Sequence, residues 1–474
     1  MRITEHPILE FERSREITFS FDGRPIRAYR GETIAAALHA AGIRVITRSK
    51  SGRPRGLFCA IGKCSSCLVT VDGIPNVKSC VTLVREGMDV RSQRGPGAID
   101  PGFRPRPRPP WPELETEVTI VGGGPAGLAA AQALLEHGLR PLIVDENPHP
   151  GGQLVKQTHK FFGSRRERAG TRGVEIASEL TSQVKEEATL FSGAQAIGFY
   201  RDGDLILALN RDRRLQIVRA RRYIIATGAE ERFLVFPGND LPGVYGAGAI
   251  QTLMNLYGVR PGNRALIVGA GNVGLIIAYQ LLQAGVEVAA VVEAAREIGG
   301  YHVHAAKIRR LGVPILTRHS VIRALGEEEV EGAVIAELDS EFNPIPGSER
   351  ELEVDLIGLA VGLIPSTRLA EQAGAEMAYL GELGGRVPLH GPTMETSVPG
   401  LYVAGDCAGI GEASTAMLEG RLAALSILAE RGLPVSEELD ETRASLARLR
   451  SGPFGERPRR GKEKVFALFE ELAR

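Results

Sequence analysis

The sequence is short of several features that would place it in a familiar class of protein. It has only five cysteines and one tryptophan in 474 residues, and its 57 basic residues match its 57 acidic residues in number. So few cysteines in a chain of this length exclude a disulfide scaffold. A net charge of zero gives no reason to expect nucleic acid or strongly acidic molecules as partners.

Long apolar runs are also absent. The alanine-rich segments are interrupted by charged residues and glycine before they reach the length of a membrane span. The first residues, MRITEH, lack the apolar core of a signal peptide. We therefore expect no membrane span, a location in the cytoplasm or at the periphery of a membrane, and about two to four domains.

Four of the five cysteines crowd into 22 positions, and this density indicates metal binding. Their spacing is C-x4-C-x2-C, then twelve residues, then the fourth cysteine. The first three match the plant-type [2Fe–2S] spacing, and such a cluster needs four thiolates. Structural zinc also accepts four cysteines and remains the alternative, although zinc ribbons favour two C-x2-C pairs and this chain has one. The expected ligands are Cys59, Cys64, Cys67 and Cys80.

Residues 118–127 predict a dinucleotide site. The short apolar run VTIV is followed by GGGPAG and an alanine-rich helix, and a second strand ends at an acid. The first glycine allows the tight turn, the second lets backbone approach a pyrophosphate, and the third lets the helix pack on the strand. The acid can accept from a ribose hydroxyl. The residues expected here are Gly122, Gly124, Pro125, Ala126, Gly127, Asp145 and Glu146.

A second unit of the same kind lies at residues 264–293. The strand RALIV precedes GAGNVG and a helix from about Leu275, and the next strand again ends at an acid. An acid at that place favours a free ribose 2′-hydroxyl, so NAD or another adenine nucleotide such as ADP suits the site better than NADP. The expected residues are Gly269, Gly271, Gly274 and Glu293.

The first hundred residues resemble a known family. A strand–turn–strand–helix lead-in over residues 17–41 precedes the cysteine run, which resembles a β-grasp [2Fe–2S] ferredoxin domain. The RPRG lead-in and the short gap to Cys80 are similar to one branch, found in opine oxidases, hydrogen cyanide synthase, dye-linked proline or hydroxyproline dehydrogenases and sarcosine oxidase α subunits. This resemblance covers roughly residues 1–95 and rests mainly on the four cysteines.

Three later segments, PGGQL, YIIATGA and GLYVAGD, resemble thioredoxin-reductase-like flavoproteins with two dinucleotide domains. All of them follow in that family's order, which implies FAD. The resemblance implies that Asp406 accepts from a flavin ribityl hydroxyl and that a helix near residues 413–424 points its N-terminus at the flavin ring. The residues it adds to the FAD site are Gly152, Gln153, Thr227, Gly228, Gly405 and Asp406.

The expected fold class is therefore α/β, with an N-terminal β-grasp [2Fe–2S] domain followed by a thioredoxin-reductase-like flavoprotein. The proline- and arginine-rich linker should be extended, with Trp111 fixed on a domain surface, and the C-terminal tail should form amphipathic helices with a docking face. The expected parts are the β-grasp domain 1–94, the linker 95–116, the FAD domain 117–245 and 366–430, the inserted nucleotide domain 246–365 and the tail 431–474.

Several residues carry weaker expectations. Cys407 is the only cysteine after Cys80, so a disulfide reductase of this fold is excluded, and we expect a buried structural thiol. No catalytic residue can be named; the candidates near the flavin are Gln153, Lys156 and His159. His302 and His304, two apart, would not share a helix face and are expected to be structural or surface residues.

The resemblance implies a subunit of an FAD-dependent amino-acid, opine or amine dehydrogenase. FAD and the cluster would pass electrons from C–N bond oxidation to an acceptor. The expected partners are a β subunit with a second flavin and the amine site, and a small iron–sulfur subunit or other acceptor. The alternative is a reductase that passes electrons from NADH through FAD to the cluster and a partner protein, which Glu293 favours. A scaffold with remnant sites is a third, lesser interpretation.

Overall fold

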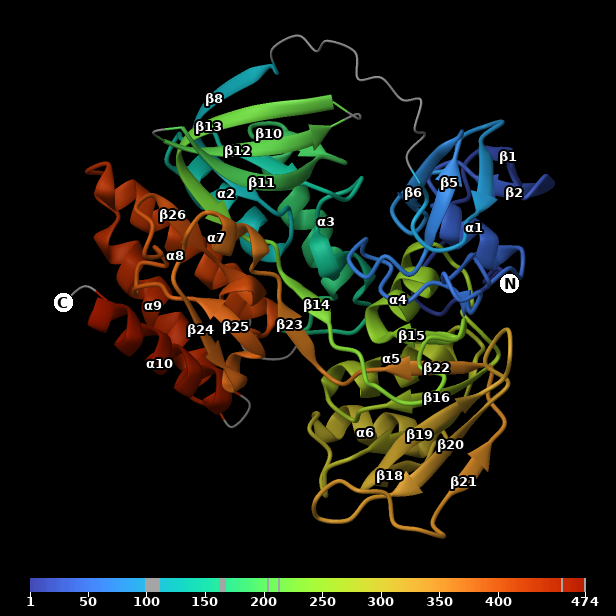
Figure 1. The fold of residues 1–474 in the computed structure, drawn as a ribbon. Helices are drawn as coiled ribbons and strands as arrows, with labels where there is room; N and C mark the ends of the chain where they lie inside the picture. Colours follow the sequence, from blue (N-terminus) through green and yellow to red (C-terminus); the bar gives the residue numbers. More distant parts are fainter. Residues whose placement is uncertain (99–110, 162–167, 203, 212–213, 453–454, 473–474) are drawn as a thin grey trace. The chain divides into compact units, whose positions relative to one another are not determined.

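The computed structural model describes residues 1–98, 111–161, 168–202, 204–211, 214–452 and 455–472. The chain divides into two compact units (Figure 1). The first unit comprises Met1–Pro105 and Glu231–Gly362, and the second comprises Arg106–Glu230 and Leu363–Arg474. Each unit is therefore assembled from two separate stretches of the sequence.

The N-terminal part of the first unit is a small sheet with one helix. Its strand order is β2-β1-β7-β5-β6, and β1 is antiparallel to β2 but parallel to β7. Asp22 and Gly23 both have positive φ, as this two-residue hairpin turn requires. Helix α1 (Ile34–Ala40) begins after Thr33, whose hydroxyl accepts from the amide of Ala36. The strands are β1 (Glu16–Phe21), β2 (Arg24–Tyr29), β3 (Thr47–Arg48), β4 (Pro54–Arg55), β5 (Leu68–Val71), β6 (Ile74–Lys78) and β7 (Asp89–Ser92).

The rest of the first unit is built on a parallel sheet with the order β15-β22-β16-β17-β18. Strand β16 leads through a glycine turn into α5 and then to β17, which is the strand–turn–helix–strand unit that the sequence predicts. A three-stranded antiparallel sheet, β19-β20-β21, completes it. The bounds are β15 (Val244–Gly246), α4 (Ala247–Gln251), the π-helical turn η2 (Thr252–Leu256), β16 (Arg264–Val268), α5 (Asn272–Gln283), β17 (Glu287–Glu293), α6 (His302–Arg310), β18 (Ile315–Thr317), β19 (His319–Leu325), β20 (Gly332–Glu337), β21 (Arg350–Leu352) and β22 (Leu356–Leu359).

The two parts of the first unit share one apolar core. Buried side chains from the small sheet and α1, such as Phe19 and Leu38, belong to the same cluster as Ile250 and Leu281 from α4 and α5. Polar contacts also join the two parts. The guanidinium of Arg44 donates to the carboxylate of Asp355 at 2.9 Å. The small N-terminal domain is therefore built into this unit rather than tethered beside it.

The N-terminal arm, residues 1–15, connects the two parts of the first unit. The amide of Ile3 donates to the carbonyl of Gly258 at 2.7 Å, and the amide of Arg260 donates to the carbonyl of Met1 at 2.9 Å. The Phe11 ring covers Gly258, where an added Cβ would lie 2.9 Å from it. The arm thus joins the nucleotide part of the unit through main-chain bonds.

The second unit is organised around a seven-stranded sheet. Its order is β10-β9-β8-β13-β12-β11, with β26 also paired to β13. Strands β10, β9, β8, β13 and β26 run parallel, whereas β12 is antiparallel to its neighbours. The strands are β8 (Glu113–Val121), β9 (Leu142–Asp145), β10 (Thr189–Ser192), β11 (Gln195–Asp202), β12 (Asp204–Arg211), β13 (Arg214–Ile225) and β26 (Leu401–Val403).

Helices α2 and α8 cross closely in the second unit. An added Cβ at Gly420 of α8 would lie 1.9 Å from the carbonyl oxygen of Ala126 in α2, so glycine is needed there. The C-terminal helices lie together in Figure 1, coloured orange to red. The other elements are α2 (Pro125–Glu136), η1 (Gly152–Lys156), α3 (Gly173–Val184), β14 (Ala229–Glu231), β23 (Leu363–Pro365), α7 (Arg368–Gln372), β24 (Met377–Leu380), η3 (Gly381–Leu383), β25 (Gly385–Pro388), η4 (Gly405–Ala408), α8 (Ala413–Glu430), α9 (Ser436–Arg450) and α10 (Glu456–Leu472).

Two boundaries differ from the sequence-based expectations. Strand β8 begins at Glu113, inside the segment predicted as linker, because β13 offers a parallel partner that reaches Ile217 opposite it. Helix α5 begins three residues before Leu275. Trp111 is 44% exposed, and its expected place on a domain surface stays a prediction. Most of the predicted linker, residues 99–110, lies outside the described residues.

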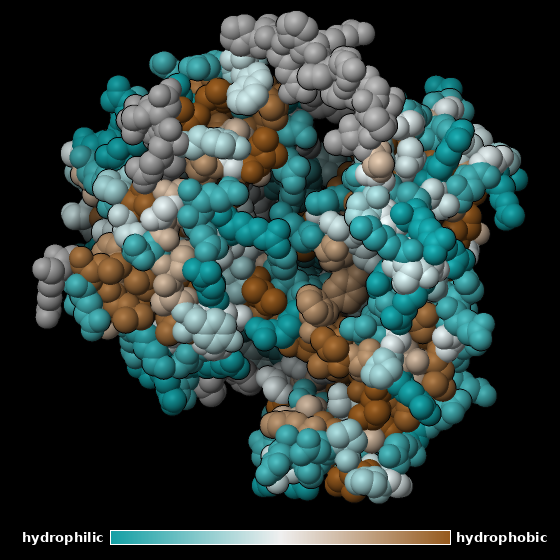
Figure 2. Space-filling model, in the orientation of Figure 1, coloured by the Kyte–Doolittle hydropathy of each residue, from teal (hydrophilic) through white to brown (hydrophobic). Residues whose placement is uncertain are grey.

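In the described part of the chain, no helix is long and apolar enough to cross a membrane. On the face drawn in Figure 2, hydrophobic residues lie in several separate patches among hydrophilic ones. The most exposed large apolar side chains include Phe233 and Val235, at 61% and 81%. Single exposed apolar residues of this kind are ordinary on protein surfaces.

Candidate functional site

The four cysteines that the sequence predicts as ligands meet beside the small sheet. Cys59, Cys64 and Cys67 lie on the loop between β4 and β5, and Cys80 follows β6. The Cys59 thiol is hydrogen-bonded to those of Cys64 and Cys80, and the Cys67 thiol is hydrogen-bonded to that of Cys80. All four are free, and only Cys64 is exposed. The fold therefore brings the thiols of residues up to 21 positions apart into one hydrogen-bonded group.

This arrangement fits a two-iron cluster. Hydrogen bonds from Cys64 and Cys80 lower the pKa of Cys59, and the same bonds raise the pKa of Cys64 and Cys80, so the thiols interact closely enough to share one bound group. The Cys64 amide also points at the Cys59 sulfur, 3.5 Å away. Among the described residues, no three His, Cys, Asp or Glu side chains are placed to hold a single ion. Four thiols in one group are the ligand number that a [2Fe–2S] cluster needs, since each of its irons takes two thiolates.

The cysteine loop, residues 56–67, packs against the nucleotide part of the same unit. The amide of Gly246, at the end of β15, donates to the carbonyl of Phe58 at 2.9 Å. At Gly56 an added Cβ would lie 3.0 Å from Pro242, so the two segments are in close contact. Asp240 also forms ion pairs with Arg55 of β4 and with Arg53 just before that strand, where the chain leads into the loop. The position of the cysteines therefore depends on contacts that are distant in the sequence.

The first glycine loop has the geometry of a phosphate cradle. Gly122 has a φ of +114°, and an added Cβ there would lie 2.2 Å from the carbonyl oxygen of Ala226. An added Cβ at Gly127 would lie 1.9 Å from the carbonyl oxygen of Gly122. At Gly124, by contrast, the atom nearest to an added Cβ would be the Cα of Gly152, 3.7 Å away. Gly122 and Gly127 therefore have no room for a side chain, because backbone atoms lie against them. Gly124 keeps space open at the N-terminus of α2, where a pyrophosphate is expected.

Asp145 stabilises this loop. Its carboxylate accepts from the amide of Gly123 at 2.6 Å, and from the backbone amide and side-chain nitrogen of Asn147 at 2.7 and 2.9 Å. Burial raises the pKa of Asp145, and these hydrogen bonds oppose the rise. A carboxylate has about four acceptor sites, so the predicted bond from a ribose hydroxyl is compatible with this role. Its neighbour Glu146 is half-buried.

The Gly-Gly-Gln segment packs against the first glycine loop. The amide of Gly151 donates to the carbonyl of Gly123 at 2.7 Å. Gly152 has a φ of +55°, and an added Cβ would lie 2.7 Å from the Cα of Gly124. The Gln153 side chain is exposed. These contacts make a second wall for the expected nucleotide.

The turn after β26 brings a half-buried acid, Asp406, to the same unit. Gly405 has a φ of +73°, and an added Cβ would lie 3.0 Å from Ala126, which ties the turn to the start of α2. Asp406 accepts from the amide of Gly411 at 3.1 Å, and burial raises its pKa to about 6. The Cys407 thiol donates to the carbonyl of Ile225 at 3.1 Å. Cys407 is thus the buried structural thiol that the sequence predicts.

Thr227 and Gly228 close this region at the end of β13. The Thr227 hydroxyl donates to the carbonyl of Ser366 at 2.7 Å, and Gly228 has a φ of +68°. The amide of Ser366 donates in turn to the carbonyl of Gly228 at 2.9 Å. The reciprocal bonds fix the predicted Ala-Thr-Gly turn against the segment that follows β23.

The second glycine loop, in the first unit, repeats this geometry. Gly269 has a φ of +106°, and an added Cβ would lie 2.4 Å from the carbonyl oxygen of Ala360. An added Cβ at Gly274 would lie 1.9 Å from the carbonyl oxygen of Gly269. An added Cβ at Gly271 would have no atom within 4 Å. Glu293 accepts from the amide of Ala270 at 2.8 Å, much as Asp145 does in the first loop.

Sequence reasoning missed a glycine pair at this second loop. The amide of Gly300 donates to the carbonyl of Ala270 at 3.0 Å. An added Cβ at Gly300 would lie 2.8 Å from the amide nitrogen of Asn272. The pair Gly299 and Gly300 begins six positions after Glu293, and the pair at Gly151 likewise begins six positions after Asp145. This shared spacing is the signal that was available.

The weaker candidates are placed as follows. Lys156 is buried, and the His159 ring is stacked on Phe161 with 5.6 Å between the centroids. On α6, His302 is exposed and His304 is 5% exposed, so the two histidines face differently. The prediction that they are structural or surface residues agrees with this placement.

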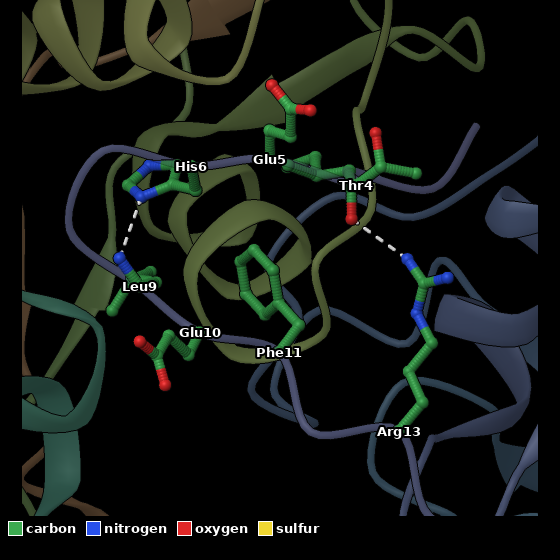
Figure 3. A pocket seen from close by; sticks show the side chains of 8 residues that line it. Thr4, Glu5, His6, Leu9, Glu10, Phe11 and Arg13 are labelled. Carbon is green, nitrogen blue, oxygen red and sulfur yellow. Dashed lines mark hydrogen bonds between the residues drawn. The ribbon is translucent and has the colours of Figure 1, made fainter.

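Two cavities among the described residues lie elsewhere. One, of about 500 Å³, is lined by the N-terminal arm, where Figure 3 shows His6, Glu10 and Phe11. Within the arm, the His6 Nδ1 accepts from the amide of Leu9 at 3.0 Å, and Arg13 donates to the carbonyl of Ile3 at 2.8 Å. A second, of about 270 Å³, lies among α2, α8 and α9. None of the predicted cofactor residues lines either cavity.

Comparison with known proteins identifies the folds that these sites belong to. Residues 116–420 match the family model of pyridine nucleotide-disulphide oxidoreductases. The chain belongs to the pyridine nucleotide-disulphide oxidoreductase family. Residues 14–95 also match the model of a 2Fe-2S iron-sulfur cluster binding domain. This member of the family therefore carries an N-terminal cluster domain ahead of its nucleotide-binding domains.

Individual relatives are named as oxidases and dehydrogenases. The chain is 33% identical over 345 residues to an opine oxidase subunit of Rhizobium meliloti (strain 1021), covering 68% of this chain and 73% of that one. It is 30% identical over 488 residues to the sarcosine oxidase alpha subunit of the same strain, covering 89% and 47%. It thus spans about half the length of the sarcosine oxidase subunits that it matches. The solved L-proline dehydrogenase from P. horikoshii is 25% identical, with a TM-score of 0.71, over 92% of this chain and 79% of that one.

These matches confirm three predictions. The family resemblance, the α/β fold class with its N-terminal [2Fe–2S] domain, and the cofactor pair of FAD and a [2Fe–2S] cluster are all confirmed. The roles of individual residues and the occupant of the second nucleotide site stay predictions.

Proposed function

We propose that this chain is the electron-transferring subunit of an enzyme that oxidises a C–N bond in an amino acid, an opine or a secondary amine. The observation that carries the proposal is the presence of two redox sites in one chain. The cysteine loop is arranged for a [2Fe–2S] cluster, and a glycine loop with Gly405 and Asp406 is arranged for FAD. Similar proteins are named as a subunit of opine oxidase and as an L-proline dehydrogenase.

Each site supplies part of an electron path. When bound, FAD takes up two electrons from a substrate, and a [2Fe–2S] cluster passes electrons on singly. The open space at Gly124 and the free amides at the start of α2 would hold the pyrophosphate, and Asp145 would accept from the ribose. Asp406 would accept from a ribityl hydroxyl. The cluster thiolates would come from Cys59, Cys64, Cys67 and Cys80.

The amine is proposed to be oxidised with the help of a partner. The relatives in opine oxidase and sarcosine oxidase are named as subunits. By analogy with these subunit-named relatives, the amine site is placed on a β subunit with its own flavin. The cluster would deliver electrons to a small iron–sulfur subunit or another acceptor.

A second candidate function is supported by the second glycine loop. The bond from Ala270 to Glu293 and the open space at Gly271 leave this loop shaped for an adenine nucleotide with a free ribose 2′-hydroxyl. NADH bound there would make the chain a reductase, with electrons passing from NADH through FAD to the cluster and a partner protein.

Anaerobic reduction separates the two functions. The purified chain would be mixed in separate samples with NADH, proline, sarcosine, glycine or an opine, and the flavin absorbance would be followed. The proposal expects no bleaching by NADH, and bleaching by one amine once the co-purifying subunit is present. Bleaching by NADH alone would establish the reductase instead. Bleaching by an amine without a partner would place the amine site on this chain.

A further inference from the structure

A cluster of buried charges lies in the second unit, beneath the turn that carries Asp406. Its centre is Glu419 of α8, which is 2% exposed. Glu419 forms an ion pair with Lys462 of α10 at 2.8 Å, and a second with Arg450 at the end of α9. Lys462 is itself 3% exposed. Charges this deeply buried are tolerated only when they are paired and hydrogen-bonded.

The same carboxylate also holds the flavin-side turn. The second oxygen of Glu419 accepts from the amide of Gly405 at 2.9 Å, directly before Asp406. Gly405 stands at the start of η4 with a positive φ, so its orientation sets that of the following residue. One side chain thus joins two C-terminal cations to the backbone that presents Asp406.

The rest of the environment fixes Lys462 in place. His390 donates from Nδ1 to the carbonyl of Gly391 at 3.0 Å, so its Nε2 is free to accept from the Lys462 ammonium at 3.2 Å. The His390 ring meets Phe466 edge-on, at 5.6 Å between centroids. Desolvation lowers the pKa of His390 to about 3, so the ring stays neutral and acts as an acceptor.

Helix α10 is seated too closely to be a detachable tail. At Gly461, next to Lys462, an added Cβ would lie 2.5 Å from Leu383 of η3. The carbonyl of Leu383 in turn accepts from the amide of Ile410 at 3.0 Å. Ile410 lies in the loop that follows Asp406. The helix therefore reaches the same turn by two routes, one through Glu419 and one through Leu383. The sequence predicts only a docking face for this tail.

We propose that Glu419 is a positioning residue for the turn that carries Asp406, that Lys462 and Arg450 hold it in its charged form, and that helix α10 is therefore an integral part of the flavin site. The inference rests on the proposed function in assigning Asp406 to the flavin. Burial raises the pKa of Asp406; the charge of Glu419 raises it further and the charge of Lys462 lowers it, so the buried charges also act on Asp406 itself.

The chain offers a matched pair of lysines for the test. Lys462→Met removes the buried cation, whereas Lys464→Met removes a lysine two positions along the same helix whose ion pair with Glu382 is exposed. FAD affinity would be measured by reconstituting the apoprotein of the full chain and following flavin fluorescence. Far-ultraviolet circular dichroism would report that each variant is folded, because the [2Fe–2S] cluster lies in the other unit and its visible absorbance reports that unit only.

Lys462→Met is expected to weaken FAD binding at least tenfold, and Lys464→Met by less than twofold, with cluster absorbance unchanged in both. Glu419→Gln keeps an acceptor for Gly405 but leaves two cations unpaired, so it should weaken binding further. The double variant Glu419→Gln/Lys462→Met should bind FAD more tightly than Glu419→Gln alone. Lys462→Arg should recover most of the affinity.

A merely structural role would give a different pattern. If Lys462→Met lowers the melting temperature but leaves the FAD dissociation constant and the absorbance spectrum of the bound flavin unchanged, the positioning role is overturned. If Lys462→Met does not fold, Arg450→Gln removes the more exposed cation and must show a smaller loss of FAD affinity; an unchanged affinity there overturns the inference. A wild-type chain that binds no FAD would overturn the proposed function as well.

Discussion

The bond between His39 and Tyr245 gives a sharp test of how the cluster domain is held. His39, on α1, and Tyr245, on β15, are each 1% exposed, and the tyrosine hydroxyl lies 3.0 Å from His39 Nε2. His39 Nδ1 donates to the carbonyl of Ala35 at 2.8 Å, so Nε2 accepts from the hydroxyl. Tyr245→Phe leaves this nitrogen buried without a donor. An unsatisfied buried acceptor costs about 1–3 kcal/mol.

The assay is a thermal melt followed at two signals. Visible absorbance reports the cluster, and far-ultraviolet circular dichroism reports the fold. In a body of roughly 150–250 residues, 1 kcal/mol changes the melting temperature by about 2–4 °C, so Tyr245→Phe should lower it by about 2–12 °C. Because the two parts of the first unit share one core, the loss of cluster absorbance should move together with the unfolding signal.

A tyrosine on the surface supplies the control. Tyr379 is 73% exposed, so Tyr379→Phe should change stability by no more than about 0.5 kcal/mol. The reasoning fails if Tyr245→Phe leaves the temperature of cluster bleaching where it is in the wild type. It also fails if the cluster bleaches well before the unit unfolds, because the small domain would then be an independent body.

Four further perturbations test the cofactor sites. Cys64→Ser should abolish the visible absorbance of the cluster and leave FAD bound; surviving absorbance would remove Cys64 from the ligand set. Gly127→Ala would place a Cβ 1.9 Å from the carbonyl oxygen of Gly122, and we expect the purified variant to have lost its FAD, which flavin released on denaturation would disprove. Asp406→Ala should weaken FAD retention, and unchanged flavin content would refute its role. Burial lowers the pKa of His390 from 6.5 to about 3. Between these two pH values the unfolded state binds more protons than the folded state, so the free energy of unfolding decreases as the pH falls. The decrease is on the order of 2 kcal/mol at pH 5. His390→Gln should flatten that dependence in melts at pH 7 and pH 5, and an equal slope in both proteins would contradict it.

The sequence predicted the parts of the molecule whose physical requirements are local. The two glycine loops could be placed because a tight turn, an open phosphate approach and a helix packed on a strand each demand glycine at a fixed spacing. The structure shows the expected backbone contacts at Gly122 and Gly269. The cysteine ligands were equally accessible, because three of the four lie within nine residues.

The features that were missed depend on contacts between distant residues. Glu419 and Lys462 are 43 positions apart, and nothing in the charged sequence of the tail distinguishes the buried Lys462 from the exposed Lys464. The shared core of the cluster domain joins segments more than 200 residues apart, as His39 and Tyr245 are. Only the second glycine pair, at Gly300, had a local signal, because its spacing from Glu293 repeats that of the first pair from Asp145.

The central claim is that one chain holds both a flavin and a [2Fe–2S] cluster as redox partners. Anaerobic titration with dithionite, followed by absorbance and by electron paramagnetic resonance, counts the electrons that the purified chain accepts. The proposed path predicts about three electrons per chain, two at the flavin and one at the cluster, with the cluster signal appearing on reduction. Uptake of two electrons with no paramagnetic cluster signal, or of one electron with no flavin bleaching, would contradict it.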